Sequence, residues 1–275
     1  MWASAALSRV NQNNHQFLTV FNAMRFPNLK AIVFDLDNTL LDHNAAERQA
    51  ISSFLPRYYH EERIGALLRE TPERFIAAYR RWNEALWRDL AMNRMTAEEL
   101  KWQRFAWTLI EVAPNFTAKD AERLGKDMGK TYLELYAEGW QLLPNADETL
   151  RTLAERYRLG LITNGFTEQQ RGKLARFGWE SRFDAAVLSG ELGVMKPHTA
   201  IFDHTLSALG LGAQEVVYVG DHYETDVVGA LAAGWRAIWF CPAPTGRPEN
   251  AVGSRVENRA DWTISSLAEL LRIES

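Results

Sequence analysis

The chain lacks the features by which membrane proteins, secreted proteins and nucleic-acid-binding proteins are usually identified. Cys241 is the single cysteine, so the chain can form neither an internal disulfide nor a zinc site with several cysteines. No stretch approaches the roughly 18 consecutive apolar residues of a membrane-spanning helix. The formal net charge is −4, so no bulk positive field attracts nucleic acid or an anionic membrane. We therefore expect a cytoplasmic protein that binds a small molecule, and neither a nucleic-acid polymer nor a membrane.

Two segments have a composition that is unusual for a folded core. Residues 1–29 contain no Asp or Glu and only two arginines, with many Asn, Gln, Ser and Ala. A transit peptide could have this composition, but the arginines are few and the apolar run is too short for a secretory signal. We therefore expect residues 1–29 to form a loosely ordered extension, as termini often do. Residues 243–259, rich in Pro, Gly, Asn and Arg, are predicted to form a surface loop.

From residue 30 onward, apolar runs typical of buried strands alternate with amphipathic stretches typical of helices. The predicted strands are 31–34, 159–162, 186–188, 216–219, 237–240 and, at an edge of the sheet, 262–264. The predicted helices are 145–157, 169–177, 200–209, 226–233 and 265–271. This alternation predicts an α/β fold, in which a Rossmann-like parallel sheet has helices on both faces and is built from residues 30–43 and 142–275.

The segment 44–141 interrupts the alternation, because it contains no convincing strand. Apolar side chains recur there at the spacing of three and four residues that is typical of amphipathic helices. The three clearest sets are Phe75, Tyr79, Trp82, Leu86 and Leu90; Trp102, Phe105, Leu109 and Val112; and Ala121, Leu124, Met128, Tyr132 and Leu135. Thr96 and Glu99 have the spacing of a capping box, which marks the start of a helix. We predict an all-helical domain inserted after the first strand.

Acidic residues follow two of the predicted strands. Asp35 and Asp37 come directly after the first strand, and with one residue between them their side chains leave the same side of the chain. Asp221 and Asp226 follow the strand 216–219. Any one of these aspartates alone would be interpreted as a helix N-cap, but two separate pairs are poorly explained in that way. Because the carboxyl ends of parallel strands meet at one edge of a sheet, the four carboxylates predict an oxygen-rich site suited to Mg²⁺.

Other polar residues follow two further predicted strands. Thr163 and Asn164 end the strand 159–162, and with Gly165 they offer a hydroxyl, an amide and flexible backbone that can donate to phosphate oxygens. Lys196 follows the strand 186–188 and precedes a proline, which disfavours a helical conformation for the lysine. Taken alone, Lys196 could be a solvated surface residue. At this edge of the sheet it would neutralise the carboxylates and an incoming phosphate.

Four ordered motifs resemble those of the haloacid-dehalogenase-like hydrolase superfamily. They are residues 34–40, 162–165, 196–197 and 220–226, and the resemblance covers roughly residues 30–242. The helical insertion also falls where that superfamily carries its helical cap, so the resemblance implies that residues 44–141 form such a cap.

The resemblance implies a role for each site residue. Asp35 would be the nucleophile that attacks phosphorus and forms an aspartyl-phosphate. Asp37 would protonate the leaving oxygen and then activate the water that hydrolyses the intermediate. Thr163, with Asn164 nearby, would hold the phosphoryl oxygens, and Lys196 would balance the charge on the nucleophile and the transferring group.

The resemblance also implies the cofactor. Mg²⁺ would be bound by Asp35, by the backbone carbonyl of Asp37 and by Asp221, with Asp226 in the inner or outer coordination shell.

The superfamily's dehalogenases lack an acid/base two residues after the nucleophile, so Asp37 implies hydrolysis of a phosphate monoester. Residues 162–170, 193–197 and 220–226 are most similar to the bacterial pyrimidine 5′-nucleotidase branch, which acts on nucleotides such as dUMP, UMP and dTMP. Asn38 departs from the Glu or Gly often found at its position, and N-acylneuraminate-9-phosphate phosphatases also have an Asn there. A sugar-phosphate phosphatase of that kind is therefore the alternative. A phosphomutase and a non-catalytic binding module are less favoured.

Aromatic residues of the segment 44–141 could stack on a nucleotide base, an interaction that contributes roughly 1–3 kcal/mol. Trp82 and Trp102 lie on the apolar helix faces and are predicted to belong to the core of the helical domain. Trp87 and Trp107 lie outside those faces, and each is predicted to be exposed or to line the substrate cleft.

Overall fold

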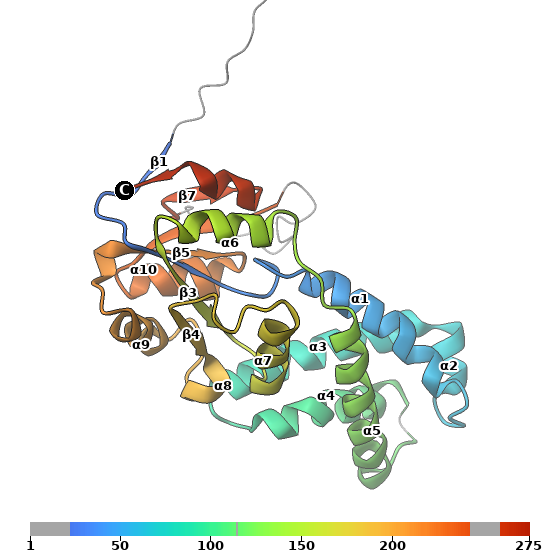
Figure 1. Cartoon of the computed structure of the whole chain (residues 1–275). Coiled ribbons are helices and arrows are strands. Elements are labelled where there is room, and N and C mark those ends of the chain that lie inside the picture. Colours follow the sequence, from blue (N-terminus) through green and yellow to red (C-terminus); the bar gives the residue numbers. More distant parts are fainter. Residues whose placement is uncertain (1–22, 114, 243–258) are drawn as a thin grey trace, which may run out of the picture.

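A parallel sheet forms the centre of the larger part of the molecule (Figure 1). The structure is a computed structural model and describes residues 23–113, 115–242 and 259–275. Within these residues the sheet has six strands, in the order β4 (Ala185–Leu188), β3 (Arg158–Thr163), β2 (Ala31–Phe34), β5 (Val216–Gly220), β6 (Arg236–Phe240) and β7 (Trp262–Ile264). Each neighbouring pair is parallel. The predicted α/β fold is confirmed, and each predicted strand matches to within one residue at either end.

The sheet is buried on both faces because successive side chains of a strand point to opposite sides. In the central strand β2, Ile32 and Phe34 belong to one apolar cluster, while Ala31 and Val33 belong to another. Helices α6 (Ala146–Ala154) and α7 (Thr167–Arg176) contribute to the first cluster. Helices α9 (Thr199–Leu209) and α10 (Gly229–Ala232) contribute to the second, and the short helix α8 (Ser189–Leu192) follows β4.

Two predicted helices differ in detail from the structure. The predicted helix 226–233 begins as a π-helical segment over Tyr223–Val228 and becomes α-helical only in α10. The predicted helix 265–271 is a 3-10 helix over Leu267–Arg272, which is capped by Ser266.

The prediction of a loosely ordered extension up to residue 29 is wrong for residues 24–29. Strand β1 (Met24–Arg25) pairs in parallel with β8 (Ile273–Glu274) near the other end of the chain. Phe26 is 1% exposed, and both Phe26 and Leu29 pack in the apolar cluster that contains Ile32 and Phe34 of β2. Residues 1–22 lie outside the described residues, and so does the predicted loop 243–259 except for its last residue.

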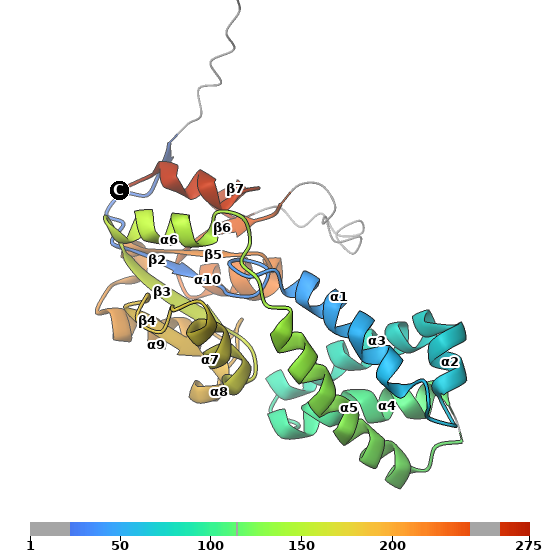
Figure 2. The same ribbon diagram turned by 45° about the vertical axis from the view of Figure 1, so that its right-hand side comes forward.

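The inserted segment is all-helical among its described residues and lies to one side of the sheet, as Figure 2 shows. Its helices are α1 (His43–Phe54), α2 (Gly65–Glu70), α3 (Pro72–Ala91), α4 (Ala97–Val112) and α5 (Ala118–Glu138), with a 3-10 helix over Leu55–Tyr58. We call this segment the cap. The predicted capping box is present, because the Thr96 hydroxyl accepts from the Glu99 amide and the Glu99 carboxylate accepts from the Thr96 amide. No helix of the described segments is both long enough and apolar enough to cross a membrane.

The cap has its own core, which is rich in aromatic rings. Phe105 lies 5.0 Å from Tyr79, 5.4 Å from Phe54 and 5.5 Å from Tyr132, measured between ring centroids. Helices α4 and α5 approach so closely at Gly129 that a Cβ atom there would lie 2.5 Å from the carbonyl oxygen of Lys101. Trp82 and Trp102 are only partly buried, so the prediction that they belong to this core is wrong.

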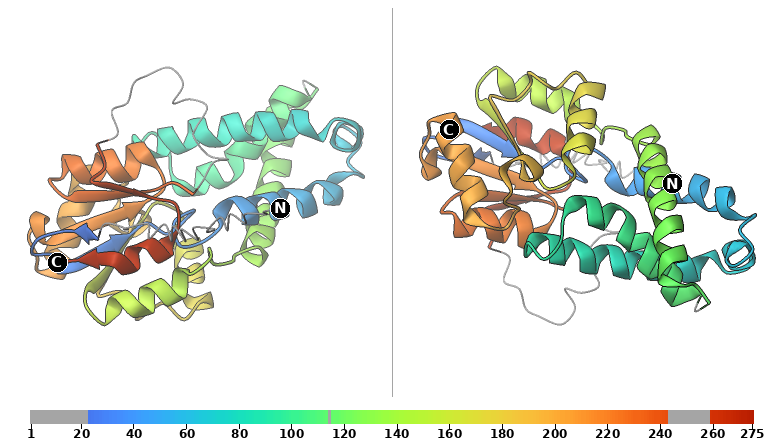
Figure 3. Two further views of the ribbon diagram at one scale, coloured as in Figure 1. Left: turned by 90° about the horizontal axis from the view of Figure 1, so that it is seen from above. Right: turned by 90° about the horizontal axis from the view of Figure 1, so that it is seen from below.

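Two connections lie side by side where the cap meets the sheet domain. The Asp42 amide donates to the carbonyl of Gln141 at 3.0 Å, and the Leu143 amide donates to the carbonyl of Leu40 at 2.9 Å. The two views in Figure 3 show α1 and α5 leaving the sheet domain from this region. Both ends of the cap are therefore anchored next to the loop that follows β2.

Candidate active site

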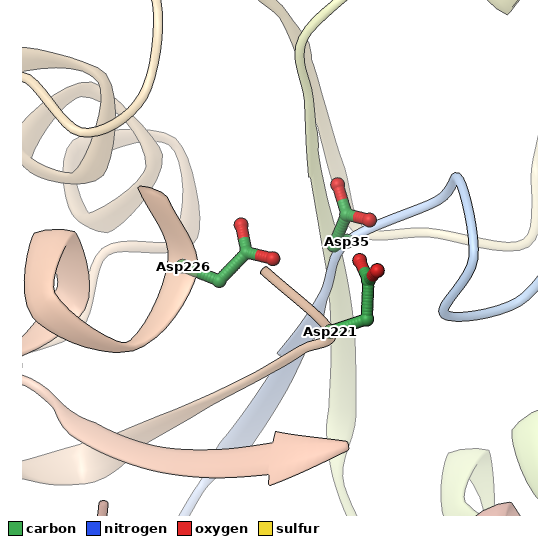
Figure 4. Close-up of side chains that lie close together, drawn as sticks. All are labelled: Asp35, Asp221 and Asp226. Carbon is green, nitrogen blue, oxygen red and sulfur yellow. The ribbon is translucent and has the colours of Figure 1, made fainter. Parts of the chain in front are cut away.

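Three aspartates converge at the carboxyl ends of the central strands. Asp35 directly follows β2, Asp221 directly follows β5, and Asp226 lies in the π-helical segment after it. Figure 4 shows their carboxylates pointing toward one another. One oxygen from each carboxylate lies within 4.8 Å of the others. They are three of the four aspartates predicted for the metal site; the fourth is Asp37.

Lys196 joins two of these carboxylates. Its ammonium is 3% exposed and donates to Asp35 Oδ1 at 2.6 Å, to Asp226 Oδ1 at 2.7 Å and to the Tyr218 hydroxyl at 2.8 Å. Burial by itself would lower the pKa of Lys196, but the adjacent Asp226 and Asp35 outweigh it and hold that pKa well above its usual range. Tyr218 donates in turn to the carbonyl of Ile162 at 3.1 Å. Sequence reasoning missed Tyr218 because a tyrosine within an apolar strand is not distinguished from core.

One lysine does not neutralise the whole cluster. Burial, with the negative charge of Asp226, raises the pKa of Asp35 to about 7 although Lys196 opposes the shift. Burial and the charges of Asp35 and Asp226 likewise raise the pKa of Asp221 well above its usual range. The cluster offers only oxygen donors and carries more negative charge than its lysine balances. A hard divalent cation such as Mg²⁺ fits this set of residues.

Thr39 and Gly220 hold the cluster in place. Thr39 is fully buried; its hydroxyl donates to Asp35 Oδ2 at 3.2 Å and accepts from the Asp221 amide at 3.1 Å. A Cβ atom on Gly220 would lie 2.5 Å from Cγ of Asp226, so the close approach of the two residues requires glycine. Sequence reasoning missed Thr39, although it lies within the motif 34–40.

Asp37 lies outside this cluster. The Lys173 ammonium donates to both of its carboxylate oxygens, at 2.7 and 2.8 Å, and Gln170 Nε2 donates to Oδ2 at 3.0 Å. Burial alone would raise the pKa of Asp37, but the charge and hydrogen bonds of Lys173 outweigh it, so the pKa lies below its usual value. Sequence reasoning missed Gln170 and Lys173. The available signal was two polar residues three positions apart on the helix that follows the 162–165 motif.

Asn164 contacts the backbone of Lys196, and Thr163 contacts Gln170. The Asn164 side chain donates to the carbonyl of Lys196 at 3.0 Å and accepts from its amide at 2.9 Å, so it holds the lysine's backbone. Binding of phosphoryl oxygens by Thr163 and Asn164 stays a prediction. The Thr163 hydroxyl lies 2.6 Å from Gln170 Nε2, and the Gly165 amide donates to the Ser189 hydroxyl at 3.3 Å.

The cap contacts the sheet domain through Phe166, which directly follows the segment 163–165. Its ring packs among cap side chains and lies 5.0 Å from the ring of Trp87, in a stacked arrangement. Trp87 therefore lies at the boundary between the cap and the sheet domain. Trp107 is 42% exposed and stacks on Trp82 at 5.5 Å instead.

Arg104 of α4 is a buried cation in the same region. It is 4% exposed, and its Nη1 donates to Asn83 Oδ1 at 3.1 Å and to the Tyr79 hydroxyl at 3.3 Å. Its guanidinium carbon lies 5.8 Å from the centre of the Phe166 ring. Among the described residues, Nη2 of Arg104 has no hydrogen-bond partner and no carboxylate lies within ion-pair distance of the guanidinium. Arg104 therefore has an unused donor near Phe166.

Comparison with known families gives a match to the haloacid dehalogenase-like hydrolases over residues 29–234. The chain belongs to the haloacid dehalogenase-like hydrolase family. The matched range begins just before β2 and ends just after α10, so it contains every site residue named above.

Two curated relatives and one solved structure show which members of the family this chain is similar to. Pyrimidine 5′-nucleotidase YjjG of Escherichia coli is 33% identical over 197 residues, which are 70% of this chain and 79% of that protein. N-acylneuraminate-9-phosphatase of Mus musculus is 30% identical over 237 residues, which are 79% of this chain and 84% of that protein. The magnesium-bound structure of HAD-hydrolase YfnB of Bacillus subtilis has a TM-score of 0.70 at 24% identity, and the match covers 88% of this chain and 96% of that chain. This member of the haloacid dehalogenase-like family is a phosphatase.

Proposed function

We propose that this phosphatase hydrolyses phosphate monoesters through an aspartyl-phosphate on Asp35, with Mg²⁺ as cofactor and (deoxy)pyrimidine nucleoside monophosphates as substrates. The observation that supports this chemistry best is the separation of two carboxylates on one loop. Asp35 contacts Lys196 and belongs to the acidic cluster, whereas Asp37 contacts Lys173 and lies outside that cluster. One carboxylate is thus available for attack on phosphorus, and the other for proton transfer.

The reaction proceeds in two displacements at phosphorus. In the first, a carboxylate oxygen of Asp35 bonds to phosphorus and the bond to the leaving oxygen breaks. Asp37, which must first take up a proton because Lys173 favours its ionised form in the free chain, gives that proton to the leaving oxygen. In the second, Asp37 takes a proton from water as the water oxygen bonds to phosphorus, and Asp35 is released. The products are an alcohol and inorganic phosphate. Lys196, buried against Asp35, stabilises the negative charge of the transferring group.

The acidic cluster would hold the cofactor. Asp35, Asp221 and the main-chain carbonyl of Asp37 would bind Mg²⁺, with Asp226 beside them, because the side chains of the three clustered aspartates offer only oxygen donors. Bound Mg²⁺ supplies positive charge that favours the ionised form of Asp35 and offsets the charge of the phosphoryl oxygens.

Arg104 supports a substrate whose leaving group carries hydrogen-bond acceptors. A buried guanidinium without an ion-pair partner is costly, and its unused donor at Nη2 would be satisfied by an acceptor on the substrate. The carbonyl oxygens of a pyrimidine base provide such acceptors, and the similarity to pyrimidine 5′-nucleotidase YjjG points to the same substrates.

The alternative is a sugar-phosphate phosphatase that acts on a substrate such as N-acylneuraminate 9-phosphate. The similarity to N-acylneuraminate-9-phosphatase supports it, and so does Arg104, because a carboxylate on the leaving group would pair with the guanidinium. A neutral base and a sugar acid thus differ in the charge that they would bring to Arg104.

Phosphate release from a panel of monoesters tests both substrate classes. The panel contains dUMP, UMP, dTMP, purine nucleoside monophosphates and N-acylneuraminate 9-phosphate, each assayed with Mg²⁺ and with a chelator. We expect the highest kcat/KM for the pyrimidine nucleotides and no turnover after chelation. A preference for the sugar phosphate would support the alternative, and turnover that persists after chelation would contradict the metal assignment.

A further inference from the structure

Lys173 of α7 forms a buried ion pair with Asp37. We propose that Lys173 and Gln170 of α7 are positioning residues, which fix the direction of the Asp37 carboxylate. This inference rests on the proposed function, because it assigns proton transfer to Asp37.

Lys173 is buried where a lysine is otherwise rarely found. Its side chain is 3% exposed, and among the described residues Asp37 is the only hydrogen-bond acceptor of its ammonium. Removing an ammonium from water is costly unless it is paired, and a purely structural side chain here could be apolar. The two short bonds to Asp37 leave the carboxylate little freedom to rotate.

Gln170 fixes the same carboxylate from a second direction. It is 1% exposed, and its Nε2 contacts Asp37 Oδ2 at 3.0 Å and the carbonyl of Asn164 at 2.9 Å. Both of these acceptors require an N–H donor, so the nitrogen of the Gln170 amide faces them and its oxygen does not. The same nitrogen lies 2.6 Å from the hydroxyl of Thr163. Gln170 thus connects Asp37 with the segment proposed to bind the phosphoryl oxygens.

Lys173 also contacts the cap where both of its connections meet. Its ammonium lies 5.2 Å from the ring centre of Tyr136 in α5 and 5.9 Å from that of Trp140, just beyond α5. The Tyr136 hydroxyl lies 2.6 Å from Nδ1 of His43, the first residue of α1. The rings of Tyr136 and Trp140 therefore flank the Lys173 ammonium on the side of the cap and help to keep it against Asp37.

The direction of Asp37 matters most when the leaving oxygen needs a proton. An ester of p-nitrophenol loses a stable anion and needs little help, whereas an ester of phenol loses a more basic oxygen. General acid catalysis contributes typically 10²–10⁴-fold when it is needed, and it depends on the acid lying within hydrogen-bond distance. Removing Lys173 should therefore slow phenyl phosphate more than p-nitrophenyl phosphate.

Arg176 offers a matched control on the same helix. It is exposed, and it ties α7 to the end of α5 by donating to the carbonyls of Ala137, at 2.6 Å, and Glu138, at 3.4 Å. Its hydrogen bonds do not involve Asp37, so Arg176→Met weakens the junction between the cap and the sheet domain without freeing the carboxylate.

The experiment measures kcat for phenyl phosphate and for p-nitrophenyl phosphate with Mg²⁺, in the wild type, Lys173→Met, Lys173→Arg and Arg176→Met. We expect Lys173→Met to lower the ratio of the two kcat values, phenyl over p-nitrophenyl, by roughly tenfold or more. Lys173→Arg should restore most of the ratio because it restores the charge and the donors, and Arg176→Met should leave it unchanged.

The outcomes separate this inference from the proposed function. An active wild type and an unchanged ratio in a folded Lys173→Met variant would overturn the positioning role alone. An equal fall of the ratio in Arg176→Met would also overturn it, since loosening the junction would then suffice. A wild type that is inert on both esters would contradict the proposed function, and the inference with it. Thermal unfolding shows whether each variant is folded, and Lys173→Arg tests the role if Lys173→Met does not fold.

Discussion

Gly220 and Asp226 are packed so closely that no side chain can be added between them. A Cβ atom on Gly220 would lie 2.5 Å from Cγ of Asp226 and 2.6 Å from its Cβ. Asp226 cannot move aside freely, because its Oδ1 accepts from Lys196 and its Oδ2 accepts from the His222 amide at 2.9 Å. The glycine at the end of β5 therefore determines where a carboxylate of the acidic cluster lies.

Gly220→Ala should therefore destabilise the protein and weaken the metal site together. Overpacking of this kind typically costs about 1–3 kcal/mol of unfolding free energy. Thermal unfolding and phosphate release as a function of Mg²⁺ concentration measure the two effects. Gly212→Ala is the control, since a Cβ atom there meets only Glu215 Oε2 at 3.5 Å. Equal effects of the two substitutions would contradict the argument.

Asp35→Asn should abolish turnover while the protein remains folded. The change is nearly isosteric, removes the nucleophilic oxygen and removes one like charge from the cluster, so we expect kcat to fall at least about a thousandfold. Phosphate release measures turnover, and circular dichroism shows whether the variant is folded. Turnover close to that of the wild type would show that Asp35 is not the nucleophile.

The stability of the metal-free protein should depend on pH through Asp35. Its pKa is raised from 3.8 to about 7 in the folded chain, so the folded state binds this proton more tightly than the unfolded state. The contribution of Asp35 to stability is therefore largest below about pH 4 and falls as pH rises toward 7, by at most about 1.4 kcal/mol per pH unit. Thermal unfolding with a chelator should show Asp35→Asn gaining stability relative to the wild type between about pH 4 and 7. Asp203→Asn, an exposed change on α9, should show no such trend.

Magnesium should raise the unfolding temperature of the wild type. A cation that binds only the folded state at a hundred times its Kd stabilises it by about 2.7 kcal/mol. Asp221→Asn should lose most of this shift because it removes one of the clustered oxygen donors, whereas Glu148→Gln, an exposed change on α6, should keep it. A shift that is retained in Asp221→Asn would place the bound cation elsewhere.

Arg104→Met should separate binding of the leaving group from the chemistry at phosphorus. We expect KM for dUMP to rise roughly tenfold, because one hydrogen bond from a charged donor is lost. KM for p-nitrophenyl phosphate should stay unchanged, because that ester has neither a base nor a sugar. Arg88→Met, in which an exposed arginine of α3 is replaced, is the control. An equal rise in KM for both esters would place Arg104 at the phosphate instead.

The parallel sheet, the inserted helical cap and the convergence of Asp35, Asp221 and Asp226 with Lys196 could all be predicted from the amino-acid sequence. Buried strands have a local signature of consecutive apolar residues, and the carboxyl ends of parallel strands necessarily meet at one edge. Residues that directly follow strands are therefore brought together by topology alone.

The partners of these residues could not be predicted, because they depend on tertiary packing. Gln170 and Lys173 reach Asp37 across 133 and 136 positions of the chain, and Tyr218 reaches Lys196 from within an apolar strand. Such contacts depend on how α7 and the strands pack, and this packing cannot be predicted from the periodicity of the sequence. The burial of Phe26 and Leu29 was missed for the same reason. Whether a terminal segment of low charge is buried depends on the shape of the folded domain next to it.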